Sequence, residues 1–287
     1  MTITIEPLTR REIHPFMHLL RSGFEEEISD RGTDFADMER LLSLVLLGNG
    51  LPLRAIRRLT GHEAFVLIAK SKGRVVGSLQ IVGHQSPSLI GIYVLPDFRG
   101  QRVALRLIEE ALVRLKAHGH RSARVGAIDE VAQHLAERAG FVPYEKIDLY
   151  RRSLPAEITS PPGVRIEYSR KREPTDHPYD IRFLRRVIGF RATRITAVDG
   201  TRGVLSCTLI TQPYQRVGEI RPRLLIPGRE DTFLPCLAEG CKWLSRLKKE
   251  EVHLPLPSDE EDLANLALTA GFRKDRSWVH LAIDLSN

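Results

Sequence analysis

The strongest constraint on the fold of this 287-residue chain is that its two halves resemble each other. The heptapeptide LAERAGF at 135–141 returns as LALTAGF at 266–272, and Leu95–Pro96 returns as Ile226–Pro227, both 131 positions later. The segment IAKSKGRVVGSLQI at 68–81 returns as ITAVDGTRGVLSCTLI at 195–210, about 128 positions later. These features keep their order and nearly their spacing. The pattern predicts a duplicated domain of roughly 130 residues, a normal domain size and too long for a solenoid repeat.

The boundary between the two copies is marked by a segment that breaks regular structure. Residues 152–168 include Pro155, Pro161, Pro162 and Gly163, a composition typical of a linker. We therefore predict a first domain over 1–154, a linker over 155–163 and a second, degenerate domain over 164–287.

Within the first half, the pattern of apolar residues predicts a defined order of elements. A strand at 2–6 precedes helical regions at 10–28 and 35–47, a hairpin at 65–83 and a strand at 88–95. From Gln101, apolar residues recur every four positions as far as Leu115, and Gly119 ends this helix. A strand at 123–128, a helix at 130–139 and a strand at 144–154 follow. This order predicts an α/β (α+β) protein, each domain a mixed, mostly antiparallel sheet with helices on both faces.

Charge and hydropathy exclude several broad classes of protein. The net charge of +7 is spread evenly, with 22 basic and 18 acidic residues over 1–154 and 21 and 18 over 155–287. A nucleic-acid binder more often concentrates its charge on one element, so we expect none as a partner. No apolar run approaches the roughly 18 residues of a membrane span. The opening residues lack the apolar core of a secretion signal, so we expect a cytoplasmic protein without a membrane partner.

The three cysteines give no sign of a disulfide or a metal site. Cys207, Cys236 and Cys241 are odd in number, and no pair has the CxxC spacing. We interpret them as small buried thiols and predict no metal.

The segment VLPDFRGQRVAL, at 94–105, combines a strand end, a short turn and a helix start. The first N–H groups of a helix are unpaired and carry partial positive charge, so they attract anions. Gly100 permits close backbone approach, and Arg99 and Arg102 add charges suited to phosphate. The same residues also suit an ordinary connection with solvated arginines. The ATP loop GxxxxGK[ST] and the dinucleotide motif GxGxxG are both absent here.

These residues, followed by AGF at 139–141, resemble the GNAT superfamily of acyl-CoA N-acyltransferases. The family loop has the form Q/R-x-x-G-x-G/A after a strand ending in V-x-P. Val94, Pro96, Arg99 and Ala104 match it, and Gly100 fits the frequent R-G pair. The resemblance covers about 150 residues of the first half, and the second half more faintly. It implies tandem GNAT-like domains, the first of them competent.

The resemblance implies an N-acetyltransferase that transfers an acetyl group from acetyl-CoA, used as co-substrate, to an amine. The sheet is then expected to open beside the loop and admit the thioester. The implied CoA-binding residues are Tyr93 and Val94, beside the pantetheine arm, and Arg99, Gly100, Gln101, Arg102, Val103, Ala104 and Leu105, around the pyrophosphate. The sequence departs from the family at Arg102, which stands where the middle glycine is expected. Its side chain either crowds the pyrophosphate or clasps it.

Catalytic residues are harder to assign. The family often uses a tyrosine before the AGF corner as acid and a glutamate as base. The first position holds Ala136 here, and residues 88–94 contain no carboxylate. The candidates that remain are Tyr144 and Tyr150 as acids and His134 as base, with His84 a further base. Each residue also suits a purely structural role.

The second half differs most at its own copy of the loop. The shift by 131 places Glu230, Asp231, Thr232 and Phe233 against residues 99–102. Carboxylates there oppose phosphate, so we expect this half to bind no CoA and to serve a structural or substrate-cleft role. Asp231 and Thr232 also suit a helix cap.

The acceptor remains open at the level of sequence. Residues 24–40 contain seven acidic and two basic residues, which suits either a wall for a cationic amine or a solvated helix face. We expect a small-molecule or peptide amine. The alternative function is a catalytically inactive GNAT-like protein that binds or senses a ligand. The oligomeric state is not predicted.

Overall fold

The computed structural model describes residues 2–24, 35–46, 50, 54–55, 57–58, 61–159, 163–169, 191–212 and 215–286. The chain forms two compact units. The described part of the first unit runs to Glu145 and resumes at Val279, near the C-terminal end. The second holds the described residues between Lys146 and Trp278.

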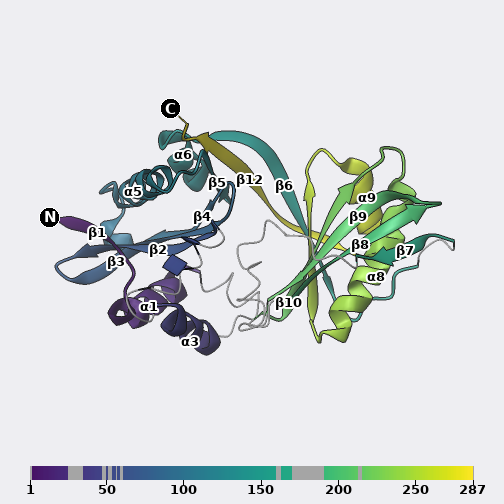
Figure 1. The fold of residues 1–287 in the computed structure, drawn as a ribbon, viewed down its shortest axis with the longest axis horizontal. Coiled ribbons are helices and arrows are strands. Elements are labelled where there is room, and N and C mark those ends of the chain that lie inside the picture. Colours follow the sequence, from purple (N-terminus) through teal and green to yellow (C-terminus); the bar gives the residue numbers. More distant parts are fainter. Residues whose placement is uncertain are drawn as a thin grey trace. The chain divides into compact units, whose positions relative to one another are not determined.

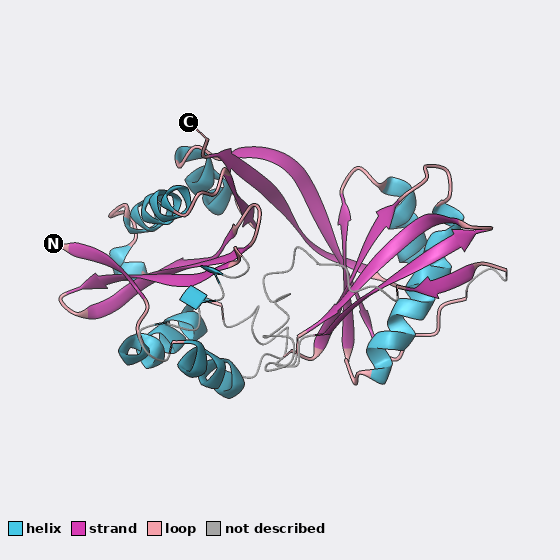
Figure 2. Ribbon diagram, in the orientation of Figure 1, coloured by secondary structure: helices cyan, strands magenta, loops and turns pink. Residues whose placement is uncertain are grey.

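The first unit is a mixed sheet between two layers of helices (Figures 1 and 2). Its strands lie in the order β1-β2-β3-β4-β5-β12. They are β1 (Ile3–Pro7), β2 (Glu63–Ser71), β3 (Arg74–Gly83), β4 (Ser88–Val94), β5 (Ser122–Ala127) and the end of β12 (Arg273–Asp284). The helices are α1 (Ile13–Gly23), α3 (Phe35–Val45), α5 (Val103–Ala117) and α6 (Glu130–Arg138), with short 3-10 turns η1 (Arg10–Glu12) and η2 (Pro96–Phe98).

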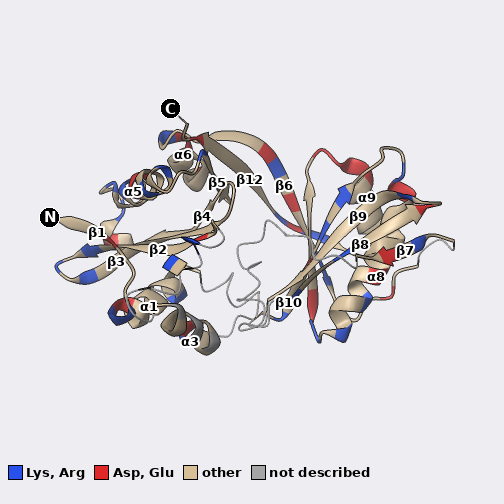
Figure 3. Ribbon diagram, viewed as in Figure 1, with Lys and Arg blue, Asp and Glu red and all other residues tan. Residues whose placement is uncertain are grey.

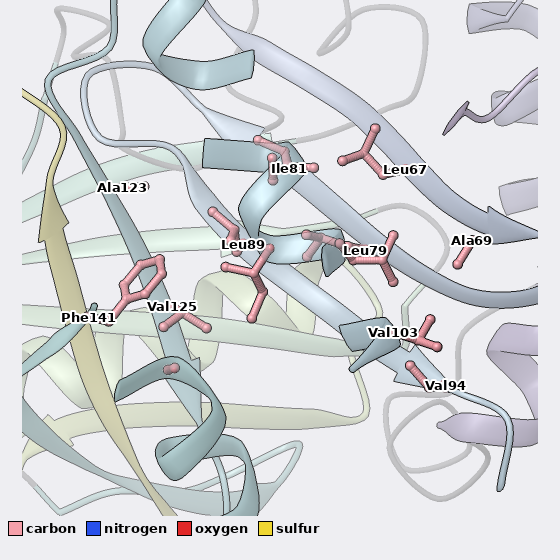
Figure 4. Packing of buried hydrophobic residues seen from close by; sticks show 14 of the residues in the cluster. Leu67, Ala69, Leu79, Ile81, Leu89, Val94, Val103, Ala123, Val125 and Phe141 are labelled. Atoms are coloured by element: carbon pink, nitrogen blue, oxygen red, sulfur yellow. The ribbon is translucent and has the colours of Figure 1, made fainter. Parts of the chain in front are cut away.

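Two apolar clusters hold these layers together. On one face, α5 and α6 pack on the sheet around a cluster that includes Leu79, Leu89, Val125 and Phe141 (Figure 4). On the other face, α1 packs over Ile68 and its neighbours. The expected helices on both faces of the sheet are therefore present in the first unit.

Helix α5 illustrates how the sequence pattern produces the packing. Val103, Leu107, Ala111 and Leu115 recur every four residues and are all buried, because that spacing aligns them along one face of a helix. Gly119 follows the helix with a φ of 87°, a left-handed conformation that glycine adopts without strain. The helix therefore begins and ends close to where its sequence predicts.

The second unit repeats this order of elements. Its strands lie in the order β6-β11-β10-β9-β8-β7. They are β6 (Val142–Ser153), β7 (Arg165–Tyr168), β8 (Arg191–Asp199), β9 (Arg202–Thr211), β10 (Val217–Leu224) and β11 (Glu251–Pro257). A 3-10 turn η3 (Glu230–Thr232), α8 (Phe233–Arg246) and α9 (Glu261–Thr269) complete it, and both helices contribute to one buried cluster. The succession β10, η3, α8, β11, α9 mirrors β4, η2, α5, β5, α6.

Two strands pass from one compact unit into the other. Strand β6 begins in the first unit, and its residues from Lys146 pair with β11 in the second. Strand β12 begins in the second unit, and Val279–Asp284 pair with β5 in the first. Each unit therefore completes its sheet with a strand segment from the other half of the sequence. The sequence boundary at 155–163 stays a prediction.

Candidate active site

The sheet of the first unit opens between β4 and β5. These parallel strands pair at only two positions, Ser88 with Arg124 and Leu89 with Val125. Beyond them β4 continues beside β3 to Val94, with a register shift between Ser78 and Gln80. Gly91, within this irregular stretch, has a φ of 60°. One edge of β4 is therefore left without pairing to β5, which is the opening expected from the sequence.

The loop after β4 leads into the N-terminus of α5. Arg102 is the residue that precedes the helix, and no side chain caps the helix there. Arg102 has a φ of 59° and Gly100 a φ of 73°. A side chain added at Gly100 would meet nothing within 4 Å. The space beside Gly100 is therefore open, and the first N–H groups of α5, just after it, have no partner within a helix. Such a terminus suits an anion.

Arg102 has a left-handed backbone conformation, which glycine adopts without strain. A left-handed conformation costs a residue with a side chain roughly 1–2 kcal/mol relative to the right-handed one. Its side chain is exposed. The departure from the family pattern therefore places a charged, exposed side chain on a residue with positive φ.

Other side chains fix the loop to the end of β4. Arg99 donates from Nε to the carbonyl oxygen of Val94 at 3.1 Å, and its guanidinium carbon lies 5.6 Å from the centre of the Tyr93 ring. The Tyr93 hydroxyl donates to the carbonyl oxygen of Ser22 in α1 at 3.3 Å. Gln101 donates from Nε2 to the Asp97 carbonyl at 3.0 Å. The side chains of Arg99, Tyr93 and Gln101 therefore brace the loop.

The three candidate catalytic residues lie in different places. Tyr144, on β6 in the first unit, is 53% exposed. Tyr150, on the same strand, belongs to the buried core of the second unit, and burial raises the pKa of its hydroxyl. His134 is exposed on α6, and Ala136, where the family acid was expected, is buried in the first unit's core. His84 stacks on His62, with ring centres 4.8 Å apart.

Sequence reasoning missed a group of polar side chains next to Tyr144. The Nδ1 atom of His280, on β12, lies 3.1 Å from a carboxylate oxygen of Glu145. The Tyr144 ring stacks on the imidazole, with centres 5.9 Å apart and planes at 29°. Glu145 and His280 are 135 positions apart, so no local motif connects them. Only the position of β12 next to β6 in the strand order brings them together.

A buried carboxylate, Glu63, lies at the start of β2. Glu63, only 2% exposed, contacts His118 at 2.9 Å and His120 at 3.1 Å through the same oxygen. The sequence places His14 and His18 four apart on α1, a spacing that also suits metal ligands. Among the described residues, however, no three His, Cys, Asp or Glu side chains gather in a way that would hold a metal ion.

In the second unit, the charged side chains of the corresponding loop already bind the loop backbone and neighbouring charged residues. Glu230 accepts a hydrogen bond from the Gly228 N–H at 3.1 Å. Asp231 contacts Arg229 at 3.1 Å, and Arg229 also contacts Asp199 at 2.6 Å. Thr232 precedes α8 but does not cap it, since its hydroxyl donates to the Arg229 carbonyl.

The acidic segment of the first unit, 24–40, lies largely outside the described residues.

The fold, the opening between β4 and β5 and the uncapped helix agree with a sequence comparison. The profile of the acetyltransferase (GNAT) family matches residues 35–141, which include the opening, the loop and α6. Residues 35–141 therefore form a domain of the GNAT family. No curated protein matches its sequence significantly.

Solved structures of GNAT proteins, one of them a tandem GNAT protein, share the fold over nearly all of this chain. A tandem GNAT protein from the clavulanic acid biosynthesis pathway is similar with a TM-score of 0.65 at 13% identity, over 100% of this chain and 99% of that one. A GCN5-related N-acetyltransferase from Sphaerobacter thermophilus gives 0.62 at 14%, over 99% and 96%. A glucosamine N-acetyltransferase region of a fungal GH3 β-N-acetylglucosaminidase gives 0.65 at 13%, over 98% of this chain and 38% of that one. At these identities the likeness concerns the fold, which is the predicted tandem GNAT fold.

Three further features of the chain are the hydropathy of its helices, the distribution of its charges and the burial of its thiols. No described helix is both long and apolar enough to cross a membrane. Lys and Arg are interspersed with Asp and Glu in both units (Figure 3). Cys207, Cys236 and Cys241 are buried free thiols, as the sequence predicts. Burial raises the pKa of the Cys241 thiol to about 12, which keeps it protonated at neutral pH.

Proposed function

We propose that this protein is an acetyl-CoA-dependent N-acetyltransferase whose first domain binds the thioester and acetylates an amine. One observation carries the proposal. The unpaired edge of β4 runs directly into a loop with Gly100 and Arg102 in left-handed conformations, followed by an uncapped helix. An extended pantetheine arm needs backbone groups along its length, and a pyrophosphate needs N–H donors at its end. Along this chain the free edge of β4 comes first and the uncapped helix follows, which is the order that the arm and the pyrophosphate need.

The assignment of roles follows from these contacts. Backbone N–H groups of Val103, Ala104 and Leu105 lie in the first turn of α5 and suit the pyrophosphate. The exposed Arg102 side chain adds a positive charge beside them. Tyr93 and Val94 offer the backbone edge for the pantetheine arm, while Arg99 supports the loop through the Val94 carbonyl.

The acceptor that we propose is a primary amine of a small molecule or a peptide. The family match supports acyl transfer to an amine. The similarity to a glucosamine N-acetyltransferase region makes amino sugars a reasonable first class to test. We propose no part in CoA binding for the second domain, because Glu230 already takes a loop N–H and Asp231 adds negative charge.

Thermal unfolding of the full chain with and without acetyl-CoA tests the proposal. A ligand that binds only the folded state stabilises it by about 2.7 kcal/mol at a hundred times its Kd. We expect a rise in Tm with acetyl-CoA and with CoA, and amine-dependent release of CoA thiol with a suitable acceptor. No rise in Tm with either compound would refute CoA binding.

Arg99→Ala tests the loop in particular. The change removes the bond to the Val94 carbonyl and the contact with Tyr93. We expect CoA affinity to fall about tenfold, equivalent to about 1.4 kcal/mol. Isothermal titration calorimetry measures this, with Arg216→Ala, in the second domain, as a matched control that leaves affinity unchanged. Equal affinity of Arg99→Ala and wild type would contradict the supporting role.

A second function remains supported by a specific observation. Ala136 is buried where the family acid was expected, and Tyr150 is in the core of the second unit. A GNAT protein that binds CoA without turnover would have this appearance. Saturable CoA binding without thiol release across amino sugars, polyamines and peptides would favour this ligand-sensing role.

A further inference from the structure

Strand β4 carries a bulge just after the point where it leaves β5. Leu89 is the last β4 residue that pairs with β5. The next residue, Ile90, faces Gln80 of β3, and then two residues of β4, Gly91 and Ile92, share one position of β3. Bulges of this kind recur beside active sites, where they redirect the backbone and its side chains. This one lies on the stretch of β4 that β5 leaves unpaired.

The side chain of Gln80 is on the face of the sheet away from α5 and α6. Its neighbours Leu79 and Ile81 pack in the cluster under those helices, and successive residues of a strand point to opposite faces. Its partner on β2, Val66, packs in the cluster on the α1 side. This part of the α1 face is partly open, since Gln80 is only partly buried and Ile90 is 38% exposed.

The carboxamide of Gln80 lies directly over the bulge. A Cβ atom built on Gly91 would come within 2.7 Å of Gln80 Nε2, closer than non-bonded atoms approach each other. The glycine at this position therefore leaves room for the amide, besides adopting a φ of 60°. The distance places a polar side-chain group against β4 in the stretch without pairing to β5.

The Gln80 amide is available to a ligand. Among the residues that the structure describes, no hydrogen bond engages this amide, so it can turn to present either its NH2 donors or its Oε1 acceptor. From Ile90 to Val94 the one polar side chain of β4 is Tyr93, and its hydroxyl already donates to the Ser22 carbonyl. Over this stretch of β4, Gln80 therefore supplies an oxygen that is free to accept a hydrogen bond.

We propose that Gln80 binds the acceptor amine and holds its nitrogen at the opening; this inference rests on the proposed function. With the pantetheine arm on the unpaired edge of β4, the acceptor has to bring its nitrogen to that edge. Gln80 Oε1 accepts a hydrogen bond from one N–H of the amine. Attack on a thioester needs the reacting atoms about 3–3.5 Å apart, and this bond restrains the nitrogen at such a position.

The hydrogen bond to Gln80 favours a primary amine over a secondary one. The nitrogen of a primary ammonium group loses one proton to water, attacks the thioester carbon and forms the C–N bond as the C–S bond breaks. A second proton passes to the sulfur, so the products are an acetamide and CoA thiol. The acetamide of a primary amine keeps one N–H, so the bond to Gln80 lasts through the reaction. A secondary amine ends without an N–H and loses it.

Steady-state thiol release by the full chain tests the proposal, with acetyl-CoA and the best substrate among glucosamine, spermidine and a dipeptide. Gln80→Met keeps the side-chain length and removes both hydrogen-bonding groups. We expect KM for the amine to rise at least about tenfold, because a bond to a charged group is lost. The kcat should stay within about threefold and CoA affinity, from calorimetry, within about twofold, as for a group that binds one substrate only.

Two further variants separate amine binding from structural support. Gln80→Glu keeps an oxygen at the same place, so KM for these cationic amines should equal or fall below that of wild type. Gln133→Met makes the same chemical change at a partly buried position of α6, which packs on the other face of the sheet, and should leave KM unchanged. Because the Gln80 amide has no partner in the free protein, Gln80→Met should also keep the wild-type Tm.

The outcomes distinguish this inference from the proposed function. Wild-type turnover together with an unchanged amine KM in Gln80→Met, a loss confined to kcat or to CoA affinity, or a lowered Tm would overturn the role of Gln80 and leave the proposed function standing. Equal loss of the amine KM in Gln80→Glu and Gln80→Met would overturn it as well. A wild type that releases no thiol with any probe would instead refute the proposed function, and with it this inference.

Discussion

At the scale of single residues, Arg102 shows what a departure from a family pattern means physically. The glycine of the family pattern is absent, yet the backbone keeps a positive φ of 59°. Strained conformations of this kind persist where the surrounding structure requires them, often at functional sites. The sequence predicted the position and the two opposite roles of its side chain. It did not predict the backbone conformation, because local sequence gives arginine no preference for a left-handed φ.

Arg102→Gly distinguishes these roles. Glycine relieves the strain but enlarges the entropy of the unfolded chain, so the free energy of unfolding should stay within about 1 kcal/mol of wild type. Loss of the charged side chain should weaken CoA binding about tenfold. Chemical denaturation and calorimetry measure the two effects. Arg102→Ala, which loses the charge but keeps the strain, is the control. Tighter CoA binding by Arg102→Gly would show that the side chain obstructs the site.

At the scale of elements, one ion-pair group joins the first strand to the hairpin. Lys70 on β2 contacts Glu6 of β1 at 2.9 Å and Glu12 of η1 at 2.8 Å. Hydrogen bonds to Glu12 and Glu6 raise the pKa of Lys70. The bond from Lys70 lowers the pKa of Glu6. Burial opposes ionisation of Glu12, but the hydrogen bonds from Lys70 and Thr9 outweigh it and lower its pKa.

These shifts give stability a defined dependence on pH. Carboxylates with lowered folded pKa values stabilise the fold above their unfolded pKa, near 4.5, and lose that contribution as pH falls further. Lysine with a raised pKa loses its contribution only as pH rises above 10.5. We therefore expect Lys70→Met to lower the free energy of unfolding by about 1 kcal/mol at pH 7, a small value because Glu6 is half exposed and its charge is screened by solvent. In a plot of unfolding free energy against pH, the variant should also have a shallower slope on the acid side (the acid limb). An acid limb as steep as that of wild type would contradict this account.

The sequence could predict most helices and strands, but not which strands lie next to each other in the sheet. Periodicity located α5, because Leu107 and Leu115 recur at helical spacing and are buried. Alternation located the hairpin of β2 and β3. Neither pattern indicates which strands lie side by side, so the sequence did not predict the pairing of β5 with β12. The same limit explains the site. The loop was predicted from contiguous residues, whereas His280 and Glu145 meet only through long-range pairing.

At the scale of the whole molecule, the exchange of strands makes each unit depend on the other half of the sequence. Leu281 is fully buried in the core of the first unit, yet it is six residues from the C-terminal end of the chain. Without Val279–Asp284, β5 would have an unpaired edge on that side, and such edges promote aggregation. A duplicated chain with exchanged strands is therefore expected to fold as one cooperative system, in contrast to independent repeats.

Deletion of residues 279–287 tests this dependence. The truncated chain loses the strand beside β5 and the buried Leu281 and Leu285. We expect the first unit to lose its stable fold, since removing one buried leucine side chain alone costs about 2–5 kcal/mol. Circular dichroism and the Tm shift with acetyl-CoA measure the outcome, with deletion of 286–287 as a control that keeps both. If residues 1–154 alone folded cooperatively and bound CoA, the exchanged strand would be dispensable and the sequence-predicted boundary near 155–163 would describe an autonomous domain.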